Sequence, residues 1–195
     1  PALNVLAKRG GEHEEAYVRY LSTQGLSVEI LNGQSVHATV AAMRKGVDVI
    51  VQAMLVDEDR HEGNLRWLGY AGILYKVSAP SGLGNWSYEV QDTKLSRNTR
   101  AATLLQLSLY TELLHKIQGY EPAYMYVVKP GPVAETRPFE VEQFRFADFK
   151  AYYRHAKKTL EHVMQDEPRR TYPEQVEHCN ICRWWKECDK QRHDD

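Results

Sequence analysis

Hydrophobic and polar residues follow two different periods along this chain. Apolar residues recur every three or four positions in four long segments, which is the spacing of a helix with one buried face. Helices are therefore predicted over residues 3–21, 35–45, 99–119 and 148–163. Between them, short apolar runs and alternating stretches predict strands over residues 27–31, 47–56, 65–78, 88–94, 122–128 and 138–146.

Glycine, proline and acidic residues mark the expected ends of these elements. Gly46 and Gly119 should end helices, and Asp148 lies near the N-cap of the last predicted helix. Gly10-Gly11 is expected to interrupt the first helix. Turns or breaks are expected at residues 32–33, 57–64, 80–85 and 130–132.

This order of elements predicts an α/β fold with a central mixed β-sheet flanked by helices. A domain is expected over residues 1–167, with a cysteine-bearing tail over residues 168–195 packed on it. The chain has 195 residues, of which 43% are hydrophobic and 26% charged, as in an ordinary globular domain. Asp48 and Gln52 are polar exceptions in the apolar strand over residues 47–56, and both are expected to be structural.

Composition excludes some classes of protein and leaves others open. No run of eighteen apolar residues is present and the start does not resemble a signal peptide, so a cytoplasmic protein is expected. The net charge of −1 neither indicates nor excludes a nucleic-acid-binding protein, because local patches steer binding more than totals do. The helical pattern is already under way at Pro1, so an N-terminal truncation of a longer chain is expected.

The segment around Asp92 carries the first candidate for chemistry. Asp92 and Lys94 lie two positions apart on a predicted strand, so they share a face about 7 Å apart. A carboxylate at such a position can hold a divalent metal, and the ammonium beside it can orient a water or stabilise an anion. In the helix that follows, Gln106 and Tyr110 are four positions apart and also share a face.

Three cysteines near the end of the chain carry the second candidate. Cys179, Cys182 and Cys188 lie within ten residues, which predicts metal or cluster ligation in place of disulfides. Two interpretations remain open. A [4Fe–4S] cluster needs a fourth thiolate, whereas a structural zinc site would be completed here by His193.

These motifs together resemble the RecB-like nucleases of the PD-(D/E)xK superfamily. The resemblance covers nearly the whole chain, and its motifs are His13, Asp92-Thr93-Lys94, Gln106 with Tyr110, and the three cysteines. It implies a restriction-endonuclease-like core and hydrolysis of DNA with Mg²⁺ or Mn²⁺, in an exonuclease-like reaction on single-stranded ends. It also implies DNA and a helicase domain or subunit as partners.

The resemblance assigns roles to individual residues. The metal ligands would be His13, the Asp92 carboxylate and the Thr93 backbone carbonyl. Lys94 would position the attacking water and stabilise charge on the phosphate, while Gln106 and Tyr110 would support the site and touch DNA. Arg97 and Arg100, beside this motif, would also bind DNA. For the cysteines it implies a [4Fe–4S] cluster, whose fourth cysteine would lie before Pro1.

One position departs from the family pattern. The strand motif of the family is Gly-x-x-Asp, and the matching segment here begins at Gly69 and ends at Gly72. Gly72 therefore stands where a metal-binding aspartate is expected, and Glu89 and Asp48 are only distant substitutes. Loss of this carboxylate should weaken Mg²⁺ binding severely, so the chain is expected to cut poorly or not at all.

Three hypotheses follow from these observations. The first is a metal-dependent nuclease, in which Gly72 marks an inactivated variant, a naturally degenerate member or an unusual site. The second is a non-catalytic nucleic-acid-binding module that retains the nuclease fold, with Lys94, Arg97 and Arg100 on its binding surface. The third is a redox or structural metal protein built on the cysteines.

Overall fold

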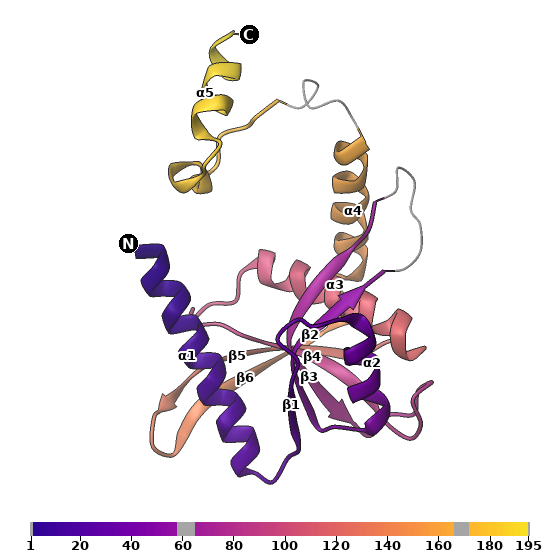
Figure 1. Ribbon diagram of the computed structural model, residues 1–195. Coiled ribbons are helices and arrows are strands. Elements are labelled where there is room, and N and C mark those ends of the chain that lie inside the picture. Colours follow the sequence, from indigo (N-terminus) through magenta and orange to yellow (C-terminus); the bar gives the residue numbers. More distant parts are fainter. Residues whose placement is uncertain (1, 58–64, 166–171, 195) are drawn as a thin grey trace. The chain divides into compact units, whose positions relative to one another are not determined.

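The fold is described from a computed structural model, which covers residues 2–57, 65–165 and 172–194 (Figure 1). The chain divides into two compact units, Pro1–Arg154 and His155–Asp195. The domain boundary expected at residues 167–168 and most of the charged turn at residues 57–64 lie outside the described residues.

The elements follow the order expected from the sequence, with two short helices added at the end. They are α1 (Ala2–Thr23), β1 (Val28–Ile30), α2 (Val36–Lys45), β2 (Val49–Val56), β3 (Leu68–Val77), β4 (Ser87–Thr93), α3 (Ala101–Gln118), β5 (Tyr124–Val133), β6 (Arg137–Arg145), α4 (Phe146–Gln165), the 3₁₀ helix η3 (Glu177–Ile181) and α5 (Trp185–Asp194). The predicted α/β class is thereby confirmed.

The six strands form one mixed sheet in the order β1-β2-β3-β4-β5-β6. The pairs β1–β2 and β4–β5 are parallel, and the other three pairs are antiparallel. The two parallel pairs are joined through α2 and α3, as parallel connections require. Figure 1 shows α1 in front of the sheet and α2 at its side.

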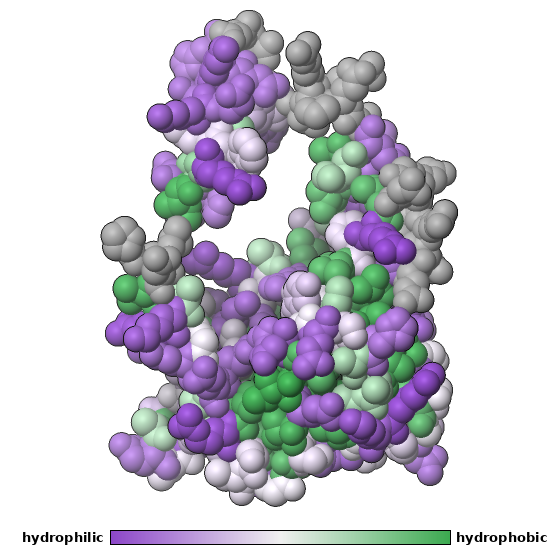
Figure 2. All heavy atoms as spheres, in the orientation of Figure 1, coloured by the Kyte–Doolittle hydropathy of each residue, from purple (hydrophilic) through white to green (hydrophobic). Residues whose placement is uncertain are grey.

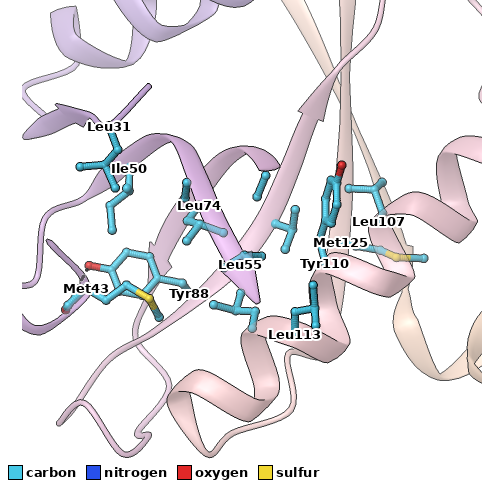
Figure 3. Close-up of a cluster of buried hydrophobic side chains, with 14 of the residues drawn as sticks. Leu31, Met43, Ile50, Leu55, Leu74, Tyr88, Leu107, Tyr110, Leu113 and Met125 are labelled. Atoms are coloured by element: carbon cyan, nitrogen blue, oxygen red, sulfur yellow. Dashed lines mark hydrogen bonds between the residues drawn. The ribbon is translucent and has the colours of Figure 1, made fainter. Parts of the chain in front are cut away.

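Apolar side chains on the two faces of the sheet form two separate cores. α1 buries Tyr17, Val18 and Leu21 against one face, where they meet Val51 and Ile73. α2 and α3 cover the opposite face, whose larger core is drawn in Figure 3. Within this core Leu107, Tyr110 and Leu113 of α3 lie against strand residues that include Leu55 and Met125. Both faces of the central strands are therefore buried, which explains their continuous apolar runs.

The glycine pair in the first helix does not interrupt it. α1 runs unbroken through Gly10 and Gly11, so that expectation was wrong. A glycine inside a helix costs about 1 kcal/mol relative to alanine. Burial of Tyr17, Val18 and Leu21 outweighs this cost, since each large apolar side chain contributes roughly 1.5–3 kcal/mol when buried.

The proline-rich segment at residues 130–132 does not end its strand either. β5 continues through it to Val133, with an irregularity between Pro130 and Val133. β4 pairs with β5 only as far as Val128, so beyond that point one edge of β5 has no neighbouring strand. Proline is tolerated at such an edge because no ladder hydrogen bond is lost.

Two helix starts also differ in detail from expectation. Ser35 caps α2 as predicted, since its side chain accepts a hydrogen bond from the Ala38 N–H. α4 begins at Phe146, so Asp148 lies in its first turn and pairs with Arg145 instead of capping the helix. No helix in the described part of the chain is long and apolar enough to cross a membrane.

Polar and apolar side chains are unevenly distributed over the outer surface. Figure 2 shows apolar side chains gathered over β1, between α1 and α2. Ile30 of β1 is 53% exposed there, on the edge strand of the sheet. A cavity between α1 and this edge is lined by Val18, Val28 and Ile30, and also by Glu14 and Gln52.

Candidate functional site

Gly72 lies at the centre of the candidate site. It sits on β3 one position before Ile73, which pairs with Gln91, so it faces Asp92 across the β3–β4 ladder. A Cβ atom at Gly72 would lie 3.1 Å from Glu14 Oε2 and 3.6 Å from Asp92 Oδ1. A space that a side chain would fill is therefore bordered by two carboxylates, one from α1 and one from β4.

Asp92 and Lys94 meet as the strand parity predicted. Lys94 Nζ lies 2.6 Å from Asp92 Oδ2. Asp92 is only 8% exposed, and its Oδ2 makes no hydrogen bond within the described residues, so the contact with Lys94 is an ion pair without hydrogen-bond geometry. Burying a carboxylate is costly unless it is compensated, and here one cation stands beside it.

His13 is brought to the end of β4 but not against Asp92. Its Nε2 lies 3.3 Å from the Val128 carbonyl oxygen, which also accepts a hydrogen bond from the Lys94 N–H. The His13 ring packs against Phe139 of β6 at 5.6 Å between centroids. Val128 is paired with Thr93, so His13 lies near the Thr93–Lys94 backbone.

Gln106 and Tyr110 meet on α3 as their spacing predicted. Gln106 Nε2 donates a hydrogen bond of 2.7 Å to the Tyr110 hydroxyl. The Tyr110 ring lies over Gly69, where an added Cβ would approach Tyr110 Cε1 to 2.4 Å. Gly69 is therefore required by the packing of α3 on β3, which explains the first glycine of the Gly69–Gly72 segment.

Two residues of the site were not singled out from the sequence. Gln52 of β2 donates a hydrogen bond of 2.5 Å from its Nε2 to Glu14 Oε1. Glu14 could have been found, because it lies on the same helical face as Val18 and Leu21, at the spacing of the buried stripe. Gln52 was visible only as a polar exception in an apolar strand.

The backbone of Gln52 is unusual. Its φ is +54°, in the left-handed region that non-glycine residues rarely adopt. It lies in the middle of β2, between the paired residues Val51 and Ala53. Conformations of this kind cluster at functional sites, and here the result is an amide side chain directed to Glu14.

The two distant substitutes for the missing acid have structural surroundings. Glu89 is 5% exposed and accepts hydrogen bonds from the Tyr126 hydroxyl and the Tyr124 N–H; burial raises the pKa of its carboxyl. Asp48 accepts hydrogen bonds from Ser27 and pairs with Lys76, and these contacts lower its carboxyl pKa to about 2. The structural interpretation of Asp48 is thereby confirmed.

Basic side chains continue away from Lys94 along the loop that leads to α3. Arg97 and Arg100 are exposed in this loop. Arg97 also lines a cavity with Lys129 and Gly131 at the base of the β5–β6 arm. Lys129 is largely buried and pairs with Glu142, so the exposed positive charge is carried by the two arginines.

The three cysteines occupy the second unit of the chain. All three are free and partly exposed, with Cys179 in η3 and Cys188 in α5. The Val176 N–H points at Cys179 Sγ at 3.4 Å, a contact that suits a metal-bound thiolate. His193 Nδ1 lies 2.8 Å from the Asp189 carbonyl oxygen, which leaves its Nε2 as the ring nitrogen available to a ligand.

Metal-ligating side chains do not converge in larger groups. Among the described residues, no three His, Cys, Asp or Glu side chains are arranged to hold a metal ion. No protein-family model matches this sequence, and no curated protein matches it significantly. The assignments of His13, the Thr93 carbonyl and the cysteines as ligands stay predictions.

Proposed function

We propose that this chain is a RecB-like, metal-dependent DNA nuclease whose activity is weakened by Gly72. The proposal rests on one observation above the others. Asp92, paired with Lys94, borders a space at Gly72 into which a side chain from β3 would project. A strand acid, a neighbouring lysine and a second strand position facing both form the arrangement that the sequence motifs imply.

The residues of this site suit a hard divalent cation. Mg²⁺ is commonly held by one or two carboxylates together with substrate phosphates and waters. Asp92 is buried with an oxygen that makes no hydrogen bond among the described residues, and an aspartate at position 72 would add a second carboxylate beside it. When bound, the metal would activate water and offset charge on the phosphodiester.

The protein's own groups would supply the remaining functions. Lys94 brings a positive charge to the edge of the site, where it can hold a water or a phosphate oxygen. Arg97 and Arg100 extend this charge along an exposed loop, which suits the DNA backbone. The hydrogen bond from Gln106 fixes the Tyr110 hydroxyl, and Tyr110 in turn supports β3 at Gly69.

Cleavage of labelled single-stranded DNA tests this function. The native chain should cut slowly or not at all with Mg²⁺ or Mn²⁺, and Gly72→Asp should cut the same substrate at least ten times faster. Chelation of the metal by EDTA should abolish the gain. If Gly72→Asp folds and binds DNA but cleaves no faster than the native chain with either metal, the catalytic assignment fails.

A non-catalytic nucleic-acid-binding module is the second candidate. It is favoured by Gly72 itself, because the basic loop with Arg97 and Arg100 is intact while one expected carboxylate is absent. This function requires DNA binding that weakens with salt and survives EDTA. Replacing both arginines by alanine should then weaken binding, and binding that disappears with EDTA would contradict it.

The cysteines would bind a metal cofactor that stabilises the second unit. Three thiolates with a fourth cysteine from elsewhere suit a [4Fe–4S] cluster, whereas Cys179, Cys182, Cys188 and His193 suit Zn²⁺. Metal analysis with a visible absorption spectrum of anaerobically purified protein separates the two. Replacing His193 with alanine should remove zinc but leave a thiolate-bound cluster in place.

A further inference from the structure

We propose that Glu14 is itself a ligand of the divalent cation at this site, and that Gln52 is the residue that positions it. This inference rests on the proposed metal-dependent function and assigns a ligand that the sequence motifs do not include. It makes the site of the native chain a two-carboxylate site, formed by Glu14 and Asp92.

The geometry places Glu14 where the missing side chain would be. Glu14 Oε2 lies 3.1 Å from the Cβ position at Gly72, and Asp92 Oδ1 lies 3.6 Å from the same point. Two carboxylate oxygens from separate elements therefore border one small space. Like charges at such a separation repel each other unless a cation lies between them or beside them.

Asp92 gives an independent indication that a ligand is missing. It is 8% exposed, and its Oδ2 makes no hydrogen bond within the described residues. Buried polar atoms of this kind call for a partner such as an ion or a water. Lys94 compensates one oxygen of Asp92 at 2.6 Å, whereas the other oxygen, Oδ1, faces Glu14 across Gly72.

Gln52 holds Glu14 in the required orientation. Its amide donates to Glu14 Oε1, which turns the other oxygen of that carboxylate, Oε2, toward Gly72. The contact depends on the left-handed backbone of Gln52, because that conformation departs from the regular strand on either side. A hydrogen-bonded second residue that orients a ligand is a common feature of metal sites.

The test is a titration of the intact chain with Mn²⁺, followed by calorimetry or by the electron paramagnetic resonance of free Mn²⁺. Glu14→Gln keeps the shape of the side chain and removes its charge, so Mn²⁺ affinity should fall about tenfold or more. Glu15→Gln is the matched control, because Glu15 is the exposed neighbour on the same helix, and its affinity should stay within about twofold of the native value.

A variant of Gln52 separates positioning from folding. Gln52→Gly removes the amide but accepts a φ of +54° without strain, so the fold should keep its stability. Mn²⁺ affinity should nevertheless fall severalfold, and a fall of the same size in Glu14→Gln/Gln52→Gly as in Glu14→Gln alone would show that Gln52 acts through Glu14.

The outcomes distinguish this inference from the nuclease assignment. Equal Mn²⁺ affinity in Glu14→Gln and Glu15→Gln, or no Mn²⁺ binding by the native chain at millimolar concentration, overturns the assignment of Glu14. If Gly72→Asp cleaves DNA while Glu14→Gln binds Mn²⁺ normally, the nuclease stands and the ligand assignment falls. If Glu14→Gln loses Mn²⁺ but Gly72→Asp never cleaves, the metal site stands without the nuclease.

Discussion

The side chain missing at Gly72 matters because of the groups that surround its position. Asp92 and Glu14 both reach this space, and each comes from an element that the fold fixes independently. The sequence predicted the pairing of Asp92 with Lys94 and of Gln106 with Tyr110, because spacing along one element determines which side chains share a face. It did not predict the approach of Glu14, because that contact joins residues from α1 and β3.

Gly69 shows the steric side of the same strand. An alanine there would bring Cβ to 2.4 Å from Tyr110 Cε1, so the ring or the strand must move. We expect Gly69→Ala to lower the free energy of unfolding by about 1–3 kcal/mol, the usual cost of overpacking. Urea unfolding measures this directly. A Gly69→Ala chain as stable as the native one would mean that Tyr110 does not pack on β3.

Glu89 gives a pH-dependent prediction. Burial raises its pKa above the ordinary 4.5, so its contribution to stability is complete below that value and is lost as pH rises through the folded-state pKa. Glu89→Gln should therefore flatten the decrease in the free energy of unfolding above pH 4.5. Glu140→Gln, an exposed control on β6, should keep the native pH profile. A native-like profile in Glu89→Gln contradicts the raised pKa.

At the scale of elements, most helices and strands followed from periodicity and from capping residues. The exceptions share a physical cause, which is that tertiary surroundings outweighed local preference. Gly10-Gly11 continues α1 because the helix is held by its buried face, and Pro130 stays in β5 because its edge has no neighbouring strand beyond Val128. The short helices η3 and α5 lack a strong apolar stripe, so the sequence gave no sign of them.

The glycines of α1 offer a prediction of opposite sign to Gly69. No atom lies within 4 Å of an added Cβ at Gly10 or Gly11, outside their own helix and chain neighbours. Gly10→Ala should therefore stabilise the chain by about 0.5–1 kcal/mol, because alanine loses less conformational freedom in a helix. Thermal unfolding of Gly10→Ala beside the native chain measures the gain. A loss of stability would show that the helix is broken at Gly10 in solution.

β1 is held to the sheet by one polar cluster as well as by its ladder. Asp48 accepts from both the N–H and the hydroxyl of Ser27, and Lys76 pairs with it from β3. Asp48→Ala should cost about 1–3 kcal/mol, since it leaves these donors without an acceptor. Amide hydrogen exchange should rise first in β1. Unchanged protection of Val28–Ile30 would mean that the cluster does not hold the strand.

At the scale of the whole molecule, the sequence predicted the α/β class and the mixed sheet because hydrophobic periodicity and element order determine both. It also brought most candidate residues to one region: His13, Gly72, Asp92 and Lys94 lie close together on α1, β3 and the end of β4. The contribution of Gln52 could not be predicted, because a left-handed residue in an apolar strand leaves no pattern in the sequence.

The most direct test of the account compares Gly72→Asp with Gly72→Asn in cleavage of single-stranded DNA with Mn²⁺. The two side chains have nearly the same shape, so the comparison isolates the added carboxylate. Gly72→Asp should cleave at least ten times faster than Gly72→Asn, and the difference should vanish with EDTA. Equal rates in the two variants, with both folded, would contradict a metal-dependent nuclease site at Gly72 and Asp92.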